Sequence, residues 1–448
     1  MGYVIKQEAD QGAEHRCAAD AQGRQKYHFH RFTSLCGEFY PDTHSICPKR
    51  KDVNDFCRST RVATSAGVCY TEKKVAVYCS IRSCYGDYRA YTFPRGKVRA
   101  FGAKRSDKLK SERGISMRIR YPEYYKTFRC IASDCPDSCC KEWEVLVDEV
   151  SAAYYREMEG PLGDDLRRYL YEDGEGDWYL RITDGRCPMW RNDGLCRIQA
   201  ERGHEALCQT CRDFPRLKHD YGDFVELGLE LSCPEAARII FSEPAQWEEE
   251  QVPGGEEPEY DGADMEVLLR TRQKMLEILA DTRYSVAESL ALGLLYGYRA
   301  QDALDGAELA EFEPEEELAF GASVAVEAHP AALAAFYLEL EILTEEWRWR
   351  LREPAGTGEW DEKLRILARY GVERYWLQAI SDFDLVGRVK MVIASCLLVR
   401  HLGGDLVETA QLYAKEIENN AENVDAILDG AYAHPALTDE KLLGWLLR

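Results

Sequence analysis

The chain has 448 residues, of which 45% are hydrophobic and 30% charged, so it can bury a sizeable core and is neither wholly disordered nor collagen-like. At roughly 100 to 200 residues per domain, this length predicts two to four domains. The longest apolar runs, such as residues 391–399, are shorter than the roughly 18 residues of a membrane span, so we expect no membrane partner. The amino-terminal sequence MGYVIKQEAD has no apolar signal stretch, which predicts a cytoplasmic location.

The net charge of −22 is unevenly distributed along the chain. Residues 1–116 carry 22 Lys and Arg against 12 Asp and Glu, whereas the remainder carries 35 basic and 67 acidic residues. The acidic remainder argues against nucleic acid as a partner, because like charge opposes the attraction of phosphates. Residues 1–116 have scattered cysteines and no sustained hydrophobic period. We expect this extension to be disordered or to arise from a wrongly chosen start codon; the alternative is an accessory zinc-binding domain.

The rest of the chain divides into three parts. Residues 117–247 are dense in Cys, Trp and Tyr and predict a Cys-rich metal-binding domain. Residues 248–264 are acidic and rich in Pro and Gly, which predicts an exposed linker. Residues 265–448 have apolar residues at helical spacing and predict an all-helical carboxy-terminal domain, with helices near 265–279, 286–303, 362–380, 385–402, 405–419 and 439–447. The expected fold class is therefore mainly α.

The chain contains 17 cysteines, and nine of them lie between residues 130 and 233. A reducing compartment makes a disulfide framework improbable, whereas soft thiolates select zinc or iron–sulfur clusters. Two alternatives remain open: inert buried thiols, and thiol–disulfide exchange at the CQTC pair of residues 208–211. The predicted metal ligands are Cys130, Cys135, Cys139, Cys140, Cys187, Cys196, Cys211 and Cys233.

Each group of polar or aromatic residues around these cysteines can be interpreted in two ways. The aromatic residues could enclose a methylated ammonium by cation–π attraction or could pack the domain; they are Tyr121, Tyr124, Tyr125, Trp143, Trp178 and Trp190. Arg212 and Arg216 could bind a carboxylate or form surface ion pairs. Asp134 and Asp137 could orient a lysine or begin turns. The residues alone assign no catalytic role.

Four ordered motifs resemble the flagellin lysine-N-methylase family, also called the FliB family. They are F-x-C-x4-C-x3-CC-x2-W (128–143), CP-x6-LC-x-I (187–198), TC-x2-FPR (210–216) and LSCPEAAR (231–238). The segment YAKEIENNAENVDAIL (413–428) is similar to the carboxy-terminal region of that family. The resemblance covers about residues 117–448, and Cys208 has no matched position in it. A looser similarity connects the chain to cysteine-rich zinc- or iron-chelating domain proteins.

The resemblance implies an enzyme that transfers methyl groups from S-adenosylmethionine to lysine side chains of flagellin or another lysine-bearing protein. It also implies an iron–sulfur cluster of the 4Fe-4S type, with zinc as the alternative. The sequence has no G-x-G-x-x-G turn, which disfavours a Rossmann-type cofactor site. The competing hypothesis is a non-catalytic protein that chelates zinc or iron, or carries a cluster, and binds a partner.

Overall fold

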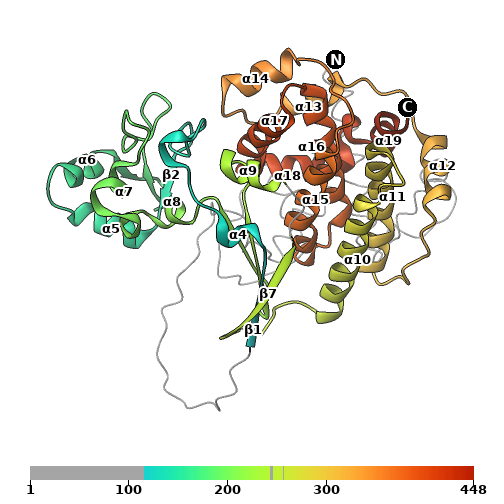
Figure 1. The fold of residues 1–448 in the computed structure, drawn as a ribbon, viewed down its shortest axis with the longest axis horizontal. Helices are drawn as coiled ribbons and strands as arrows, with labels where there is room; N and C mark the ends of the chain where they lie inside the picture. The colour runs from blue at the N-terminus through green and yellow to red at the C-terminus, as the bar shows by residue number, and fades with distance from the viewer. Residues whose placement is uncertain (1–115, 243–245, 256) are drawn as a thin grey trace, which may run out of the picture.

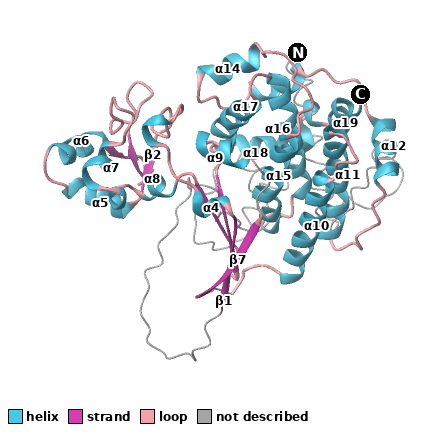
Figure 2. Cartoon of the chain, viewed as in Figure 1, coloured by secondary structure: helices cyan, strands magenta, loops and turns pink. Residues whose placement is uncertain are grey.

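The computed structural model describes residues 116–242, 246–255 and 257–448. The expectations for residues 1–116 lie outside the described residues, apart from Ser116, which begins strand β1. The described chain forms a smaller lobe, which carries most of the cysteines, and a larger helical body (Figure 1). Helices dominate both parts (Figure 2), which confirms the mainly α fold class.

A four-stranded sheet joins the two parts, with its strands in the order β5-β6-β1-β7. These strands are β1 (Ser116–Pro122), β5 (Arg216–Asp220), β6 (Phe224–Leu229) and β7 (Trp247–Pro253). Strand β1 runs parallel to β6 and antiparallel to β7, and Ile119 lies opposite Val225 and Glu250. Parallel neighbours need a long crossover connection. The smaller lobe lies within the connection from β1 to β6.

Strand β7 occupies the start of the segment that the sequence predicts as a linker over residues 248–264. Glu249 lies 3.6 Å from the Arg120 guanidinium, and Glu250 lies 3.4 Å from the Lys126 ammonium. Opposite charges on the neighbouring strands β1 and β7 favour their pairing, and Lys126 adds a contact from the helical turn that follows β1. The acidic composition that suggested an exposed linker therefore supports a strand here. Strand β7 thus includes part of the predicted linker, and helix α10 begins at Gly262, before the predicted linker ends.

The smaller lobe is built on a three-stranded antiparallel sheet in the order β2-β4-β3. Its strands are β2 (Val145–Val147), β3 (Leu170–Glu172) and β4 (Trp178–Leu180). Its helices are α5 (Glu149–Glu157), α6 (Pro161–Tyr169), α7 (Arg197–Arg202) and α8 (Gln209–Asp213), with 3-10 turns η3 (Ala132–Asp134) and η4 (His204–Ala206). Asp148 begins α5, because its carboxylate accepts a hydrogen bond from the Ser151 amide at 2.9 Å.

The helical body is a bundle around α11 and α16. Its helices are α9 (Pro234–Ile240), α10 (Gly262–Ala280), α11 (Val286–Leu304), α12 (Pro314–Val324), α13 (Ala331–Tyr337), α14 (Glu345–Arg352), α15 (Lys363–Tyr375), α16 (Leu385–Leu402), α17 (Leu406–Tyr413), α18 (Ala421–Ala433) and α19 (Asp439–Leu447). Short helix α4 (Tyr124–Thr127), 3-10 turns η5 (Trp376–Ile380) and η7 (Pro435–Leu437), and π-helix η6 (Ala414–Glu418) complete the elements.

Most of the helices expected beyond residue 264 are present. A capping box begins α11, since Ser285 and Glu288 satisfy each other's backbone amides. Helix α16 is mostly apolar and is buried on all sides from Leu385 to Val399, as expected of a central helix. The helix predicted at 405–419 is divided into α17 and the π-helical turn η6. Within the described ranges, no helix is long and apolar enough to cross a membrane.

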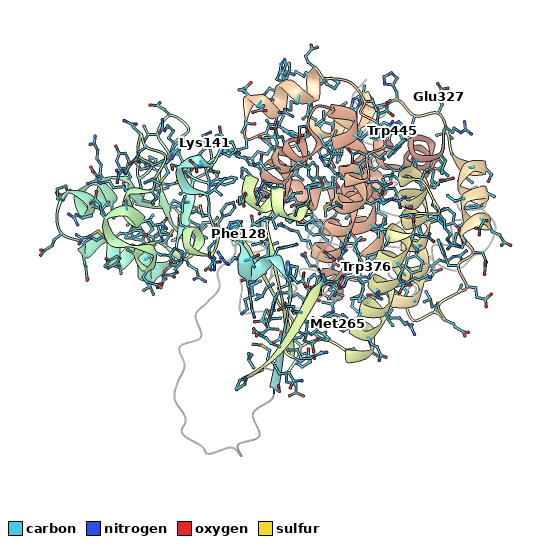
Figure 3. The ribbon with its side chains drawn as sticks, in the orientation of Figure 1. Phe128, Lys141, Met265, Glu327, Trp376 and Trp445 are labelled. Carbon is cyan, nitrogen blue, oxygen red and sulfur yellow. The ribbon has the colours of Figure 1, made fainter. Side chains whose placement is uncertain are left out.

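Each part has its own apolar core. The core of the smaller lobe includes Leu162, Leu166 and Leu180, whereas Phe128, β6 and α9 share the core of the helical body. Figure 3 shows Phe128 at the junction between the two parts. Residues 117–247, predicted as one domain, therefore contribute to two cores.

Candidate functional site

Nine cysteines reach the junction and the smaller lobe from four segments of the chain. Cys130, Cys135, Cys139 and Cys140 lie in the loop before β2, and Cys187 and Cys196 lie on either side of a second loop. Cys196, Cys208 and Cys233 are the N-cap residues of α7, α8 and α9. All described cysteines are free thiols, so no disulfide bond links these segments.

The thiols of Cys139, Cys140 and Cys187 are hydrogen-bonded in a row. Bonds from Cys139 and Cys187 lower the pKa of the Cys140 thiol, and the same bonds together with burial raise the pKa of both donors. The backbone supports this arrangement, since the Cys187 amide donates to the Cys140 carbonyl at 2.8 Å. This arrangement favours a Cys140 thiolate that accepts hydrogen bonds from the thiols of Cys139 and Cys187.

A second thiol pair is formed by Cys208 and Cys211, at the start of α8. A hydrogen bond from Cys211 lowers the pKa of Cys208, and it raises the pKa of Cys211. Cys208 was omitted from the predicted ligands, although the two-residue spacing of CQTC was a signal that could have included it. Cys196 lies between the two groups: burial raises its pKa, and the charges of Cys140 and Cys208 add to this effect.

Cys130, Cys135 and Cys233 form a third group, where the smaller lobe meets the helical body. Burial raises the pKa of Cys233 to about 11, with further contributions from the charges of Cys135 and Cys130. The Cys135 thiol donates to the Asp137 carbonyl at 3.2 Å. Cys233 belongs to the core of the helical body, so this group spans both parts.

The nine thiols form pairs and rows rather than a closed ligand shell. Among the described residues, no three Cys, His, Asp or Glu side chains surround one point at which a metal ion could sit. Clustered thiols, among which Cys140 and Cys208 have a lowered pKa, have the donor chemistry that zinc and iron–sulfur clusters require. The residues therefore fit a soft metal in their chemistry, while the side chains as placed do not converge on it. We refer to these nine cysteines as the thiol array.

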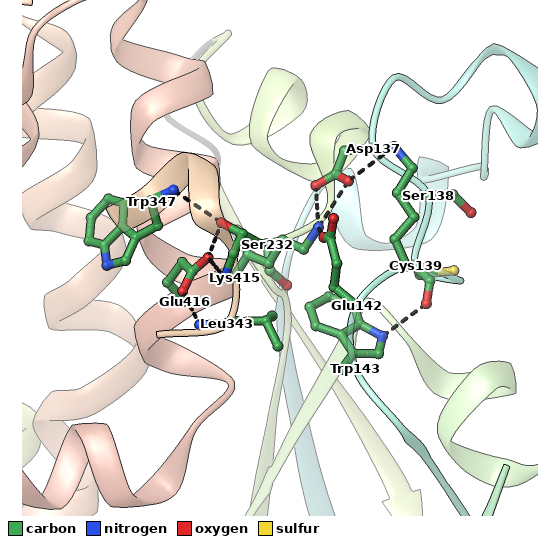
Figure 4. Close-up of polar contacts among 12 residues, drawn as sticks. Asp137, Ser138, Cys139, Glu142, Trp143, Ser232, Leu343, Trp347, Lys415 and Glu416 are labelled. Carbon is green, nitrogen blue, oxygen red and sulfur yellow. Dashed lines mark hydrogen bonds and ion pairs between the residues drawn. The ribbon is translucent and has the colours of Figure 1, made fainter. Parts of the chain in front are cut away.

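An ion-pair cluster joins the thiol array to the carboxy-terminal helices (Figure 4). The Lys415 ammonium, on η6, lies 2.9 Å from both carboxylate oxygens of Asp137 and 2.6 Å from Glu142. The Trp143 ring faces the same ammonium at 5.4 Å, and its indole N–H donates to the Cys139 carbonyl at 2.9 Å. Neither Lys415 nor Glu142 could be identified from the sequence, because their pairing connects positions more than 270 residues apart.

The other residues singled out from the sequence are placed in several environments. Asp137 belongs to the Lys415 cluster, whereas Asp134 is exposed. Arg216 lies over the rings of Tyr125 and Phe128 at 5.9 and 5.3 Å rather than against a carboxylate. Trp178 and Trp190 lie under Arg156 and Arg186 at 4.5 and 4.0 Å, so those two rings already have cationic neighbours from this chain.

Comparison with known proteins gives matches in one family. The chain is 33% identical to the flagellar biosynthetic protein FliU of Salmonella muenchen over 132 residues, which is 28% of this chain and 78% of FliU. The chain belongs to the FliB-like family of FliU and lysine-N-methylase. This confirms the resemblance to the FliB family, over a segment of 132 residues.

Two further relatives in the FliB-like family are named lysine-N-methylase, from Salmonella typhimurium strain LT2 and from Salmonella choleraesuis strain SC-B67. Each is 33% identical over 132 residues, covering 28% of this chain. The match spans about a third of the length of these two methylases, 33% of each. Neither a family model nor a solved structure matches the chain.

Proposed function

We propose that this protein is a protein-lysine N-methyltransferase that uses S-adenosylmethionine and acts on flagellin or another lysine-bearing protein. The observation that carries the proposal is the match to FliU and to two proteins named lysine-N-methylase. The names of these relatives support lysine as the acceptor and a flagellar protein as the substrate. Because the match covers a third of each methylase, the activity of the whole protein is part of the proposal.

The reaction needs a neutral lysine amine and a bound methyl donor. The ε-nitrogen attacks the methyl carbon of the sulfonium, the new N–C bond forms as the C–S bond breaks, and the electron pair of that bond neutralises the sulfur. The amine must first lose its proton, either by burial in an apolar site or to a nearby base. This displacement balances without a redox step. In that route the proposed metal would serve as a cofactor anchor or a structural element. The alternative is a radical route, which the metal would initiate.

The fold supports a donor site other than the dinucleotide type. In such sites a glycine-rich turn follows the first strand and opens a helix. Here β1 ends at Pro122, and Glu123 leads directly into the four-residue helix α4. No glycine brings the backbone close to a ligand at this point. We therefore propose that the methyl donor binds at the thiol array or beside it.

The thiol array would hold the metal that we propose, an iron–sulfur cluster or zinc. When bound, the metal would supply an electrophilic centre or a redox couple beside the substrate. The chain itself would supply the thiolates, with Cys139, Cys140 and Cys187 as the first set, because they are already hydrogen-bonded to one another.

Binding of S-adenosylmethionine to anaerobically purified protein tests the proposal. We expect saturable binding to the native protein, and we expect Cys140→Ala to lower the content of iron or zinc. Cys396→Ala is the matched control, because Cys396 is a fully buried thiol in α16 outside the array. Absence of donor binding by metal-loaded native protein would overturn the enzyme proposal and favour a metal-carrying binding protein.

A further inference from the structure

Lys415 is a buried lysine whose partners come from the other part of the molecule. Its side chain is 3% exposed, and those of Asp137 and Glu142 are 25% and 35% exposed. Gln411, one helical turn earlier, donates to Asp137 at 3.1 Å and to the Ser232 carbonyl at 2.7 Å. The carboxy-terminal helices thus contribute an ammonium and an amide to one loop of the thiol array.

Asp137 and Glu142 are interleaved with cysteines in that loop, which runs from Cys135 to Glu142. Asp137 lies two residues from both Cys135 and Cys139, and its carbonyl accepts from the Cys135 thiol. Glu142 has a positive φ of 74°, which a residue with a long side chain seldom adopts. Contacts from outside the loop must therefore maintain this conformation, and the Lys415 ion pair at 2.6 Å is one of them.

The π-helical turn directs three charged side chains, those of Lys415, Glu416 and Glu418, to different partners. Lys415 faces the cysteine loop, whereas Glu416 accepts from the amides of Leu343 and Thr344 at 2.8 and 2.9 Å. Glu418 lies 3.2 Å from the Arg374 guanidinium inside the body. π-helical turns are rare and are often found at functional sites. Lys415 is thus held by a segment that is itself fixed on two other sides.

We propose that Lys415 is a positioning residue, which sets the conformation of the 135–142 loop and thereby the placement of the Cys135, Cys139 and Cys140 thiols. This inference rests on the proposed function in one respect: that function gives the thiol array a role in metal binding. It implies that the helical body controls the geometry of this loop chiefly through Lys415, with Gln411 adding a hydrogen bond to Asp137.

Thiol alkylation followed by peptide mass spectrometry tests this inference. Lys415→Met removes the ammonium and keeps an aliphatic side chain. We expect the half-buried thiols of Cys135 and Cys140 to react at least about tenfold faster in this variant, because loop opening becomes easier. Cys396, fully buried in α16, reports global unfolding and should remain unreactive. Lys415→Arg retains the charge and should react more slowly than Lys415→Met.

Lys390→Met is the matched control. Lys390 is equally buried, at 6% exposure, and pairs with Asp439 at 3.0 Å and with the Ala431 carbonyl at 2.7 Å, away from the cysteine loop. It should leave the reactivity of Cys135 and Cys140 unchanged. Equal acceleration in both methionine variants, or none in Lys415→Met, would overturn the proposal.

If Lys415→Met unfolds the whole protein, which reaction of Cys396 would show, a second variant provides the test. Asp137→Asn preserves the shape of a partly exposed side chain and removes its charge, so it should fold and should accelerate Cys135 and Cys140 alone. No acceleration in folded Asp137→Asn would then overturn the proposal. The readout requires no methyl donor, so failure of S-adenosylmethionine binding in the native protein would leave the positioning role standing.

Discussion

His219 is a residue whose surroundings tie stability to pH. It lies on β5, opposite Glu226 of β6, and its Nε2 is buried with no hydrogen-bond partner among the described residues. Burial lowers its pKa to about 4; the charges of Arg374 and Arg272 also lower it, and Glu226 opposes them. The folded protein therefore keeps this imidazole neutral at pH values where an unfolded chain would protonate it.

The free energy of unfolding should fall as the pH is lowered from about 7 to about 5. The unfolded chain takes up a proton near pH 6.5 and the folded chain only near pH 4, so acid favours the unfolded state. We expect His219 to account for about 1–2 kcal/mol of this loss. Urea unfolding at both pH values should show a correspondingly smaller loss in His219→Gln. An identical loss in the native protein and the variant would contradict this assignment.

At the scale of elements, a buried ion pair connects the central sheet to the helical bundle. Arg272 of α10 donates to both oxygens of Glu226 on β6, at 2.6 and 2.7 Å, and both side chains are almost fully buried. Arg120 of β1 reaches the same carboxylate at 2.8 Å. One buried carboxylate therefore ties two strands and one helix together.

Arg272→Met should destabilise the protein strongly. Removing one partner of a buried pair costs about 3–5 kcal/mol, and we expect the lower part of that range because Arg120 still compensates Glu226. The matched control is Arg238→Met, which breaks the exposed pair with Glu235 and should cost less than about 1 kcal/mol. Chemical denaturation measures both values; a loss in Arg272→Met no larger than that of the control would show that the pair does not hold the sheet to α10.

The sequence predicted some elements well and others poorly, for physical reasons that differ. Helices such as α11 and α16 were predicted because apolar periodicity and caps are local features. Strand β7 was missed, because its acidic residues pair with Arg120 and Lys126, about 130 residues earlier. The cysteines predicted as ligands lie in separate groups of neighbouring thiols, and their role as metal ligands stays a prediction. Lys415 could not be predicted, since nothing near it in the sequence indicates its partners.

At the scale of the whole molecule, two cores predict two units of stability. Leu166 is fully buried in the core of the smaller lobe, and Leu290 is fully buried in that of the helical body. Each Leu→Ala change should cost about 2–5 kcal/mol in its own unit. Hydrogen exchange should therefore show faster exchange in α5 and α6 for Leu166→Ala, with α11 and α16 unaffected. Uniform acceleration throughout the chain would indicate one cooperative unit.

The same division bears on function, because the thiol array extends from the smaller lobe to its junction with the helical body. Cys233 comes from the helical body, and eight cysteines come from the connection that forms the smaller lobe. The array therefore depends on how the two parts are held together. Under our proposal, the acceptor lysine and the methyl donor would meet at this junction.

Methyl transfer by the anaerobically purified protein is the decisive test of the proposed activity. The protein is incubated with S-adenosylmethionine and unmethylated flagellin, and the lysine-containing peptides of flagellin are weighed by mass spectrometry. We expect mass increases of whole methyl groups on lysines, which require the donor and decrease in Cys140→Ala but not in Cys396→Ala. The proposed activity would be contradicted if flagellin and other lysine-bearing acceptors remained unmodified when the folded, metal-loaded protein had bound the donor.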